Sequence, residues 1–212
     1  MEPTSRPYRS PKRADQARRT RERVLFAATE RFLVYGYAGT SLSAVAADAG
    51  VSLATVELAF GTKAALLKAA IDSATAGDHE PVAMLQRPFA RRAAETQSAR
   101  DFLAIFSEAL AGSAARAAGL AAAAFEAAPR APEVARVAAS LAAQREAMSA
   151  WLVDGLWERS APRAGVTRQA AVDTVWALMD PVLFGRLVRD RGWTAEQFGR
   201  WFDDTIARLL LP

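Results

Sequence analysis

The sequence predicts an all-α protein, with a small helical domain at the N-terminus and a larger helical domain behind it. Apolar residues recur at helical spacing in nearly every segment between the Gly and Pro breaks, and no segment shows the two-residue period of a strand. The chain has 212 residues and is 51% hydrophobic, so it can form one small and one larger core.

The first 14 residues are predicted to form a disordered basic arm, because they contain Pro3, Pro7 and Pro11 and few apolar side chains. Residues 1–23 hold eight Lys and Arg against three Asp and Glu, whereas the rest of the chain holds 19 basic and 20 acidic residues. Such an arm suits a polyanion, since each phosphate contact releases counterions. The alternative interpretation is a solvated tail without a partner. The segment that follows the arm distinguishes this alternative from binding to a polyanion.

Residues 15–62 are predicted to form the first domain. Its first helix begins near Asp15 and ends at Gly36. Residues 40–63 then predict two short helices joined by a tight turn. Ser41 and Ser52 can cap the two helices, and Gly50 supplies the positive φ that the turn needs. This is a helix-turn-helix pattern, which presents its second helix to the DNA major groove, and it favours DNA as the partner of the basic arm.

The segment RVLFAATERFLVYGYAGTSLSAVAADAGVSLATVELAFGTKAALL, residues 23–67, resembles the DNA-binding domain of the tetracycline-repressor (TetR) family of bacterial regulators. The matching positions keep their order and spacing without a gap: Ala27, Ala28, Phe32, Gly36, Tyr37, Thr40, Ser41, Val45, Ala46, Ala49, Gly50, Val51, Ser52, Thr55, Phe60, Lys63 and Leu66. The resemblance implies a three-helix DNA-binding domain followed by a helical ligand-binding and dimerisation domain.

Two positions depart from the family pattern. Glu57 stands where the recognition helix usually carries an aromatic residue that contacts a phosphate, and Ala59 stands where a polar residue is common. A carboxylate is repelled by phosphate but can accept a hydrogen bond from cytosine N4.

Eleven residues are the candidates for contact with DNA: Arg18, Arg19, Thr40, Ser41, Ser43, Ser52, Leu53, Ala54, Thr55, Glu57 and Lys63. The hydroxyls that begin each helix can hold phosphate or act only as caps. Leu53 and Ala54 can contact thymine methyl groups. Lys63 resembles the phosphate-contacting Lys of the family.

Residues 63–212 are predicted to form the second domain. Its helices are expected near residues 63–76, 93–128, 132–159, 167–190 and 194–210, with breaks at the Pro- and Gly-containing segments between them. The dipeptide Asp180-Pro181 is expected to kink the penultimate helix, because Pro lacks a backbone donor.

The last two helices carry wide apolar stripes. In the resembling family these helices pair with their copies, which predicts a homodimer interface at Val175, Leu183, Leu187, Phe198, Trp201, Phe202, Ile206 and Leu209. The alternative is that the stripes pack into the core of the monomer.

Nine residues of the second domain are candidates to line an effector site: Phe102, Phe106, Phe125, Arg145, Met148, Trp151, Trp176, Met179 and Phe184. An ordinary core is the alternative for the apolar ones. Arg145 lies on an apolar stripe and needs an anion, which can be Glu108, Asp180 or a ligand carboxylate.

Several functional classes lack support in the sequence. The chain has no Cys, and its one His, His79, lies in a predicted loop, so neither a metal site nor a cofactor is expected. No catalytic constellation, secretory signal or membrane-spanning run is present, which favours a cytoplasmic protein that is not an enzyme. The expected function is a ligand-responsive, homodimeric transcriptional regulator, most simply a repressor of a palindromic operator. The alternative is an interaction protein that keeps the fold but no longer reads DNA.

Overall fold

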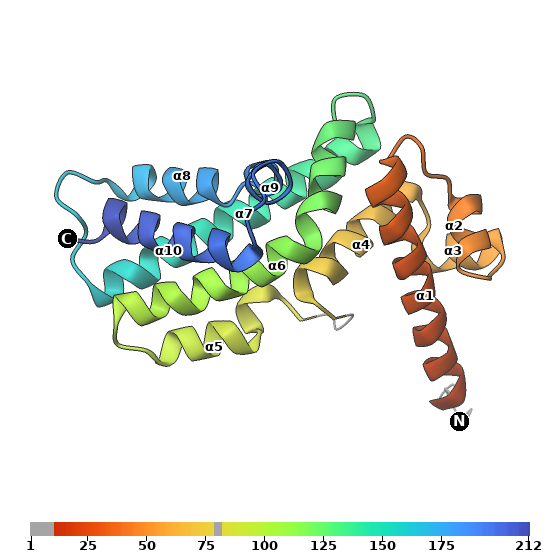
Figure 1. Cartoon of the computed structure of the whole chain (residues 1–212). Coiled ribbons are helices and arrows are strands. Elements are labelled where there is room, and N and C mark those ends of the chain that lie inside the picture. Colours follow the sequence, from red (N-terminus) through yellow and green to blue (C-terminus); the bar gives the residue numbers. More distant parts are fainter. Residues whose placement is uncertain (1–10, 79–81) are drawn as a thin grey trace, which may run out of the picture. The chain divides into compact units, whose positions relative to one another are not determined.

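The computed structural model describes residues 11–78 and 82–212. Most of the predicted arm, residues 1–10, and His79 lie outside the described residues. Within the described ranges the regular structure is helical (Figure 1). The first helix, α1, begins at Pro11 rather than at Asp15, so the last four residues of the predicted arm belong to it.

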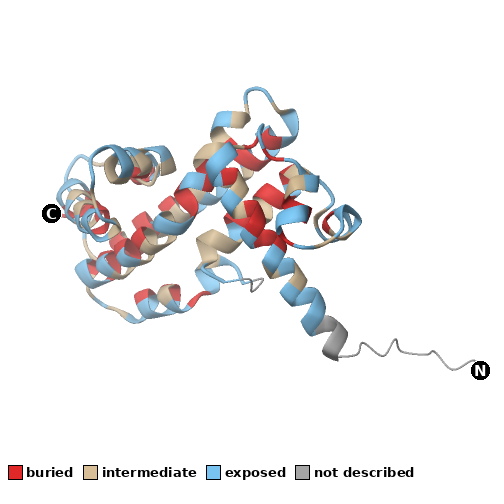
Figure 2. Ribbon diagram, turned by 45° about the vertical axis from the view of Figure 1, so that its right-hand side comes forward, coloured by how far each residue is buried: buried red, intermediate tan, exposed pale blue. Residues whose placement is uncertain are grey.

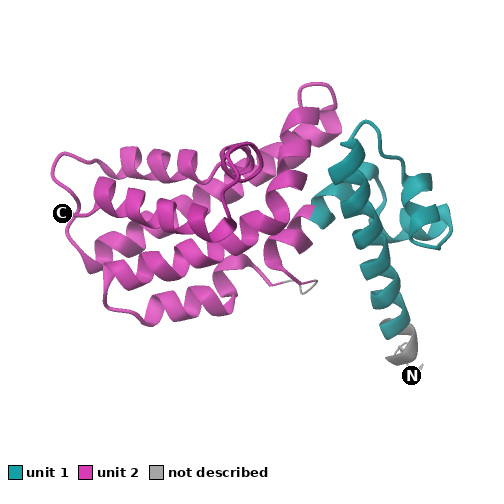
Figure 3. Ribbon diagram, viewed as in Figure 1, with its two compact units in different colours: residues 1–70 teal, residues 71–212 magenta. Residues whose placement is uncertain are grey.

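The chain divides into two compact units, residues 1–70 and 71–212 (Figure 3). The first contains α1 (Pro11–Tyr35), α2 (Leu42–Asp48) and α3 (Leu53–Phe60). The boundary falls inside α4 (Lys63–Ala76), eight residues beyond the boundary expected from the sequence. One continuous helix therefore belongs to both units.

The second unit contains six further α-helices and two short turns of other helical type. They are η1 (Met84–Gln86), α5 (Pro88–Glu95), α6 (Ala99–Ala127), α7 (Pro132–Arg159), α8 (Arg168–Leu178), α9 (Pro181–Gly185), η2 (Arg186–Asp190) and α10 (Ala195–Leu210). The sequence reading missed α5, a helix of eight residues with Pro88 at its first position. The expected kink at Asp180-Pro181 is a full break between α8 and α9.

Each unit has its own core, and buried residues lie along one side of each long helix (Figure 2). In the first unit Val24, Ala28 and Phe32 of α1 are buried, and Phe32 stacks on Tyr37 with ring centroids 6.2 Å apart. In the second unit α6 packs against both α7 and α10.

A close contact between α6 and α7 depends on Gly155. The Phe102 ring lies where a Cβ on residue 155 would be, so any larger residue overlaps it. Both residues are buried, and the ring also carries the Arg159 guanidinium at 4.4 Å from its centroid. The absence of a side chain at position 155 thus sets how closely the two longest helices approach.

We expect Gly155→Ala to lower the free energy of unfolding by about 1–3 kcal/mol, because the added methyl group overpacks the core. Gly185→Ala is the matched control, since its helical backbone has no atom within 4 Å of the added Cβ. The control should be neutral or stabilising by about 0.5–1 kcal/mol. Urea denaturation followed by circular dichroism measures both, and equal effects would contradict the packing argument.

Candidate functional site

The local geometry of α2 and α3 confirms the helix-turn-helix read from the sequence. The Ser41 hydroxyl accepts from Ala44 N at 3.1 Å at the start of α2, and the Ser52 hydroxyl accepts from Thr55 N at 3.1 Å at the start of α3. Gly50, between the helices, has a φ of 64°. Serine caps and a left-handed glycine thus fix where each helix begins and ends.

One side of α3 faces solvent. Val56 is fully buried, whereas Leu53, Ala54, Glu57 and Leu58 are exposed, and we call these four residues the outer face of α3. Their spacing of one and four residues places them on one side of the helix. This face consists of apolar groups and one carboxylate, because the helix LATVELAF contains no Lys or Arg.

Leu58 is the residue of this face that the sequence analysis missed. Its exposed fraction is 92%, the highest of any large apolar side chain among the described residues. Nothing in the spacing of the residues of α3 distinguishes Leu58 from the other outward positions. An exposed leucine beside Glu57 enlarges the apolar part of the surface that α3 presents.

The hydroxyls expected to hold phosphate differ in accessibility. Ser41 and Ser43 are exposed, and their oxygens lie 3.0 Å apart. Thr40 is 2% exposed, and its hydroxyl donates to the Gly36 carbonyl at 2.8 Å. The side chain of Thr40 therefore fixes the loop before α2, and a contact of Thr40 with DNA remains a prediction.

Lys63 is bonded within the domain. Its ammonium donates to the Tyr37 carbonyl at 2.8 Å and the Thr40 carbonyl at 2.9 Å, and it lies 4.0 Å from the centroid of the Tyr37 ring. Two of its three N–H donors are thus used to join the α1–α2 loop to the start of α4. A phosphate contact by Lys63 remains a prediction.

Two arginines of α1 hold the helix-turn-helix in place, a role that the sequence analysis did not assign. Arg21 donates to the Ala59 carbonyl at 3.2 Å and lies over the Phe60 ring at 4.3 Å, which anchors the end of α3. Arg31 bonds to both carboxylate oxygens of Asp48, at 2.5 and 3.1 Å, which anchors the end of α2. This hydrogen-bonded pair lowers the pKa of Asp48.

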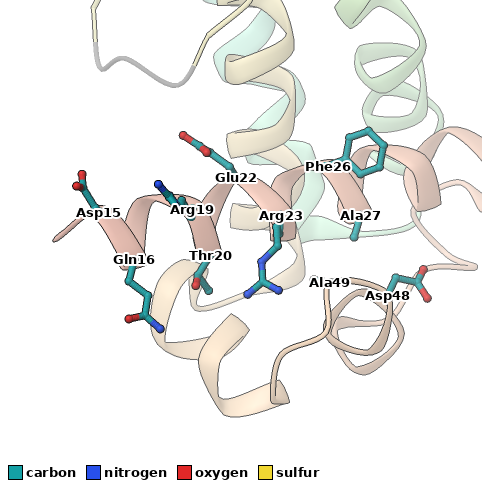
Figure 4. Close-up of a pocket in the computed structure, with 10 residues that line it drawn as sticks. All are labelled: Asp15, Gln16, Arg19, Thr20, Glu22, Arg23, Phe26, Ala27, Asp48 and Ala49. Atoms are coloured by element: carbon teal, nitrogen blue, oxygen red, sulfur yellow. The ribbon is translucent and has the colours of Figure 1, made fainter. Parts of the chain in front are cut away.

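An open groove of about 890 Å³ runs along α1 beside the end of α2 (Figure 4). Arg19 and Arg23 line it together with the acidic Asp15, Glu22 and Asp48. Arg23 points from α1 toward the turn, with Nη1 3.8 Å from the position of a Cβ on Gly50.

Arg18, also predicted to contact DNA, forms ion pairs with Asp15 at 3.0 Å and Glu22 at 3.8 Å. Both pairs lie along one side of α1, and about two-thirds of the Arg18 side chain remains exposed at 62%. The first half of α1 therefore carries mixed charge rather than a purely basic surface.

In the second unit the nine candidate effector residues fall into three packing groups. Phe102, Phe106 and Trp151 pack on one another in the main core, with Met148 and Met179 at its edge. Phe184 packs edge-on against Phe198 in a second cluster. Phe125 and Trp176 flank Arg145 in the third group.

Of the two carboxylates of the chain expected near Arg145, Asp180 is the one that contacts it. Arg145 Nη1 donates to Asp180 Oδ2 at 2.5 Å. Asp180 Oδ1 accepts from Val182 N at 2.8 Å and Leu183 N at 3.2 Å, so the same side chain caps α9. The pair thus ties α7 to the break between α8 and α9.

The eight residues of the predicted dimer interface differ in exposure. Val175, Phe198, Phe202 and Ile206 are at most 1% exposed, because they pack into the core of the second unit. Leu183, Leu187 and Trp201 are half-buried, and Leu209 is 45% exposed. These four, on α9, η2 and α10, keep surface that a second copy can cover.

Among residues 11–78 and 82–212, no group of three or more His, Cys, Asp or Glu is placed to hold a metal ion. In the same ranges, no single helix has the length and apolar composition needed to cross a membrane; α2 and α3 pass that test only as a pair bent by 111°.

Comparison with known proteins agrees with this geometry. Residues 24–70 match the model of bacterial regulatory proteins of the tetR family. No curated protein sequence matches the chain.

Three solved structures illustrate the likeness of the fold. NalD of Pseudomonas aeruginosa, the secondary repressor of the MexAB-OprM multidrug efflux pump, is 20% identical with a TM-score of 0.65, over 92% of this chain and 98% of that one. FadR of Bacillus subtilis in complex with stearoyl-CoA is 15% identical with a TM-score of 0.67, over 87% of this chain and 96% of that one. A TetR-family member of Streptomyces coelicolor is 24% identical with a TM-score of 0.60, over 91% of this chain and 99% of that one. Residues 24–70 therefore match the tetR-family model, and the chain as a whole shares the fold of these three solved structures.

Proposed function

We propose that this protein is a ligand-responsive transcriptional repressor that binds a palindromic operator as a homodimer and leaves it when a small, largely hydrophobic effector binds the second unit. The observation that carries the proposal is the exposed outer face of α3 on a capped helix-turn-helix. NalD is a repressor, and FadR was solved with stearoyl-CoA, which supports the same kind of activity here. In a twofold dimer, two α3 helices reach major grooves about 34 Å apart.

The chemistry of the outer face indicates how bases would be read. Leu53, Ala54 and Leu58 offer apolar groups to thymine methyls, and Glu57 offers an acceptor to cytosine N4. The exposed Ser41 and Ser43 hydroxyls, together with Arg18 and Arg19 of α1, supply phosphate contacts, which set position rather than sequence.

Control by an effector requires a physical link between the units, and α4 is such a link. Its first residue, Lys63, is bonded to the Tyr37 and Thr40 carbonyls in the first unit. Near its end the carbonyls of Ala74 and Thr75 accept from Arg116 of α6, at 2.8 and 3.2 Å. A shift of α6 on effector binding would therefore act on a helix whose other end is fixed to the DNA-binding domain.

A second candidate function is an interaction protein that keeps the fold without reading DNA. The absence of any cation from α3 favours it, as do the exposed Leu58 and Glu57, which suit a protein partner better than a polyanion. The two candidates differ in whether the protein selects DNA fragments.

Substitution of Glu57 separates these functions. If the carboxylate faces phosphate, Glu57→Tyr should strengthen operator binding by about 1–2 kcal/mol, roughly tenfold. If it accepts from cytosine N4, both Glu57→Tyr and Glu57→Gln should weaken binding by a similar amount and relax the preference at one base pair of each half-site. Genomic fragment selection followed by anisotropy titration measures both, with Glu30→Gln, an exposed carboxylate of α1, as the control for charge. Failure of the wild type to enrich any fragment at low salt would establish the interaction-only function instead.

Leu209→Glu tests the proposed dimer. A leucine whose exposed surface is covered by a second copy contributes about 1.5–3 kcal/mol, and the twofold axis makes each substitution act twice, so the dimer Kd should rise at least about 100-fold. Leu85→Glu is the matched control, because Leu85 of η1 is 42% exposed against 45% for Leu209. Sedimentation velocity should give a folded monomer for Leu209→Glu alone. An intact dimer would place the interface away from α10.

A further inference from the structure

The guanidinium of Arg145 has more hydrogen-bonding capacity than its surroundings use. The side chain is 10% exposed, and Nε is buried with no acceptor among the described residues. Of its five N–H donors, one, on Nη1, is bonded to a group of the protein, Asp180 Oδ2. Buried donors are nearly always paired, so an orphaned Nε indicates a group that the protein itself does not supply.

The carboxylates near Arg145 do not meet this need. Asp180 shares its charge with the N-terminus of α9, because Oδ1 accepts the two backbone N–H groups of Val182 and Leu183. Glu146, the next residue of α7, is exposed, as is Glu108 of α6. The positive charge of Arg145 is therefore paired with a single carboxylate oxygen, Asp180 Oδ2, and the other oxygen of that carboxylate caps α9.

The unpaired side of Arg145 is the side that binds carboxylates in two places elsewhere in this chain. Nε and Nη2 form one edge of the guanidinium and can donate two parallel hydrogen bonds. Arg168 uses that edge for Asp154, at 2.7 Å for both bonds, and Arg31 uses it for Asp48. At Arg145 this edge has no partner among the described residues.

Two aromatic rings lie against the guanidinium of Arg145. The Trp176 ring lies 3.8 Å from the guanidinium carbon and the Phe125 ring 5.9 Å from it. Met148 lies one turn along α7 and is partly buried. Trp176 is 36% exposed, so it covers Arg145 at the surface of the second unit and would turn aside to admit a ligand.

We propose that the Nε edge of Arg145 is the subsite for the carboxylate of a small organic acid, whose apolar body lies against Trp176 and Phe125. This rests on the proposed function in one respect only, that the second unit binds an effector, and it names the chemical class of that effector. The charge of Arg145 selects the anion, and the two rings select a flat or aliphatic body.

The test compares acids with their neutral amides on the full chain without DNA. The probes are benzoate, phenylacetate and octanoate, each against its amide, in isothermal titration calorimetry with tryptophan fluorescence as a second signal. At least one acid should bind while its amide binds at least about tenfold more weakly. Equal binding of acid and amide, or no binding of any acid at millimolar concentration, would overturn the proposal.

Two variants locate the site. Arg145→Lys keeps a cation beside Asp180 but lacks the edge of two donors, so it should bind the acid about 10- to 100-fold more weakly. Arg168→Gln, which removes an exposed guanidinium already paired with Asp154, should bind as the wild type does. Unchanged binding in a folded Arg145→Lys would contradict the assignment. If that variant does not fold, the acid-against-amide comparison on the wild type and on Trp176→Leu still decides, since loss of the ring should weaken the acid severalfold.

Release of operator DNA by the same acid is measured separately. An acid that binds through Arg145 without releasing DNA would leave the subsite in place and refute the proposed effector control. If the protein binds no DNA, the calorimetry still tests the subsite by itself.

Discussion

Arginine side chains that reach across to the carbonyl ends of other helices are the interaction on which much of this structure depends. The last carbonyls of a helix have no partner within it and carry partial negative charge. Arg21 donates to the end of α3, Arg116 to the end of α4, Arg159 to the end of α5 and Arg163 to the end of α10. Each bond satisfies an orphan acceptor and fixes one helix to another part of its own unit.

This use of arginine changes how the charge of the chain is understood. Of 27 basic residues only three are Lys, and the sequence alone suggests that the N-terminal ones serve a polyanion. In the structure Arg21 and Arg31 are bonded inside the first unit, and Arg18 is paired with acidic neighbours. These three side chains are therefore held by contacts within the first unit, and the proposed reading of bases depends on the chemistry of the outer face of α3.

The features that the sequence predicted correctly are local ones. Ser41, Gly50 and Ser52 act on residues within three positions of themselves, so their effect on α2 and α3 follows from spacing alone. Contacts such as that of Arg21 with Ala59, 38 positions away, depend on how helices pack and leave no periodic signal.

The apolar stripes of the last helices also show that periodicity does not predict contacts between distant residues. Periodicity identified an apolar face at Val175, Phe202 and Ile206, but it does not say what covers that face. The structure shows that the core of the second unit covers these three residues. The sequence shows that Arg145 is a charged residue on an apolar stripe and needs an anion. That this anion is Asp180 and not Glu108 follows only from the packing of the helices.

The continuity of α4 has a mechanical consequence. Its 14 residues form a rod about 21 Å long at 1.5 Å per residue. If the end held by Arg116 tilts by about 10° while the rod stays straight, the far end moves by roughly 3–4 Å, about the rise of one base pair. A small tilt of α4 at Arg116 would thus move the Lys63 end of the helix by about the distance between neighbouring base pairs. Such a tilt would be too small to disturb the packing around α6.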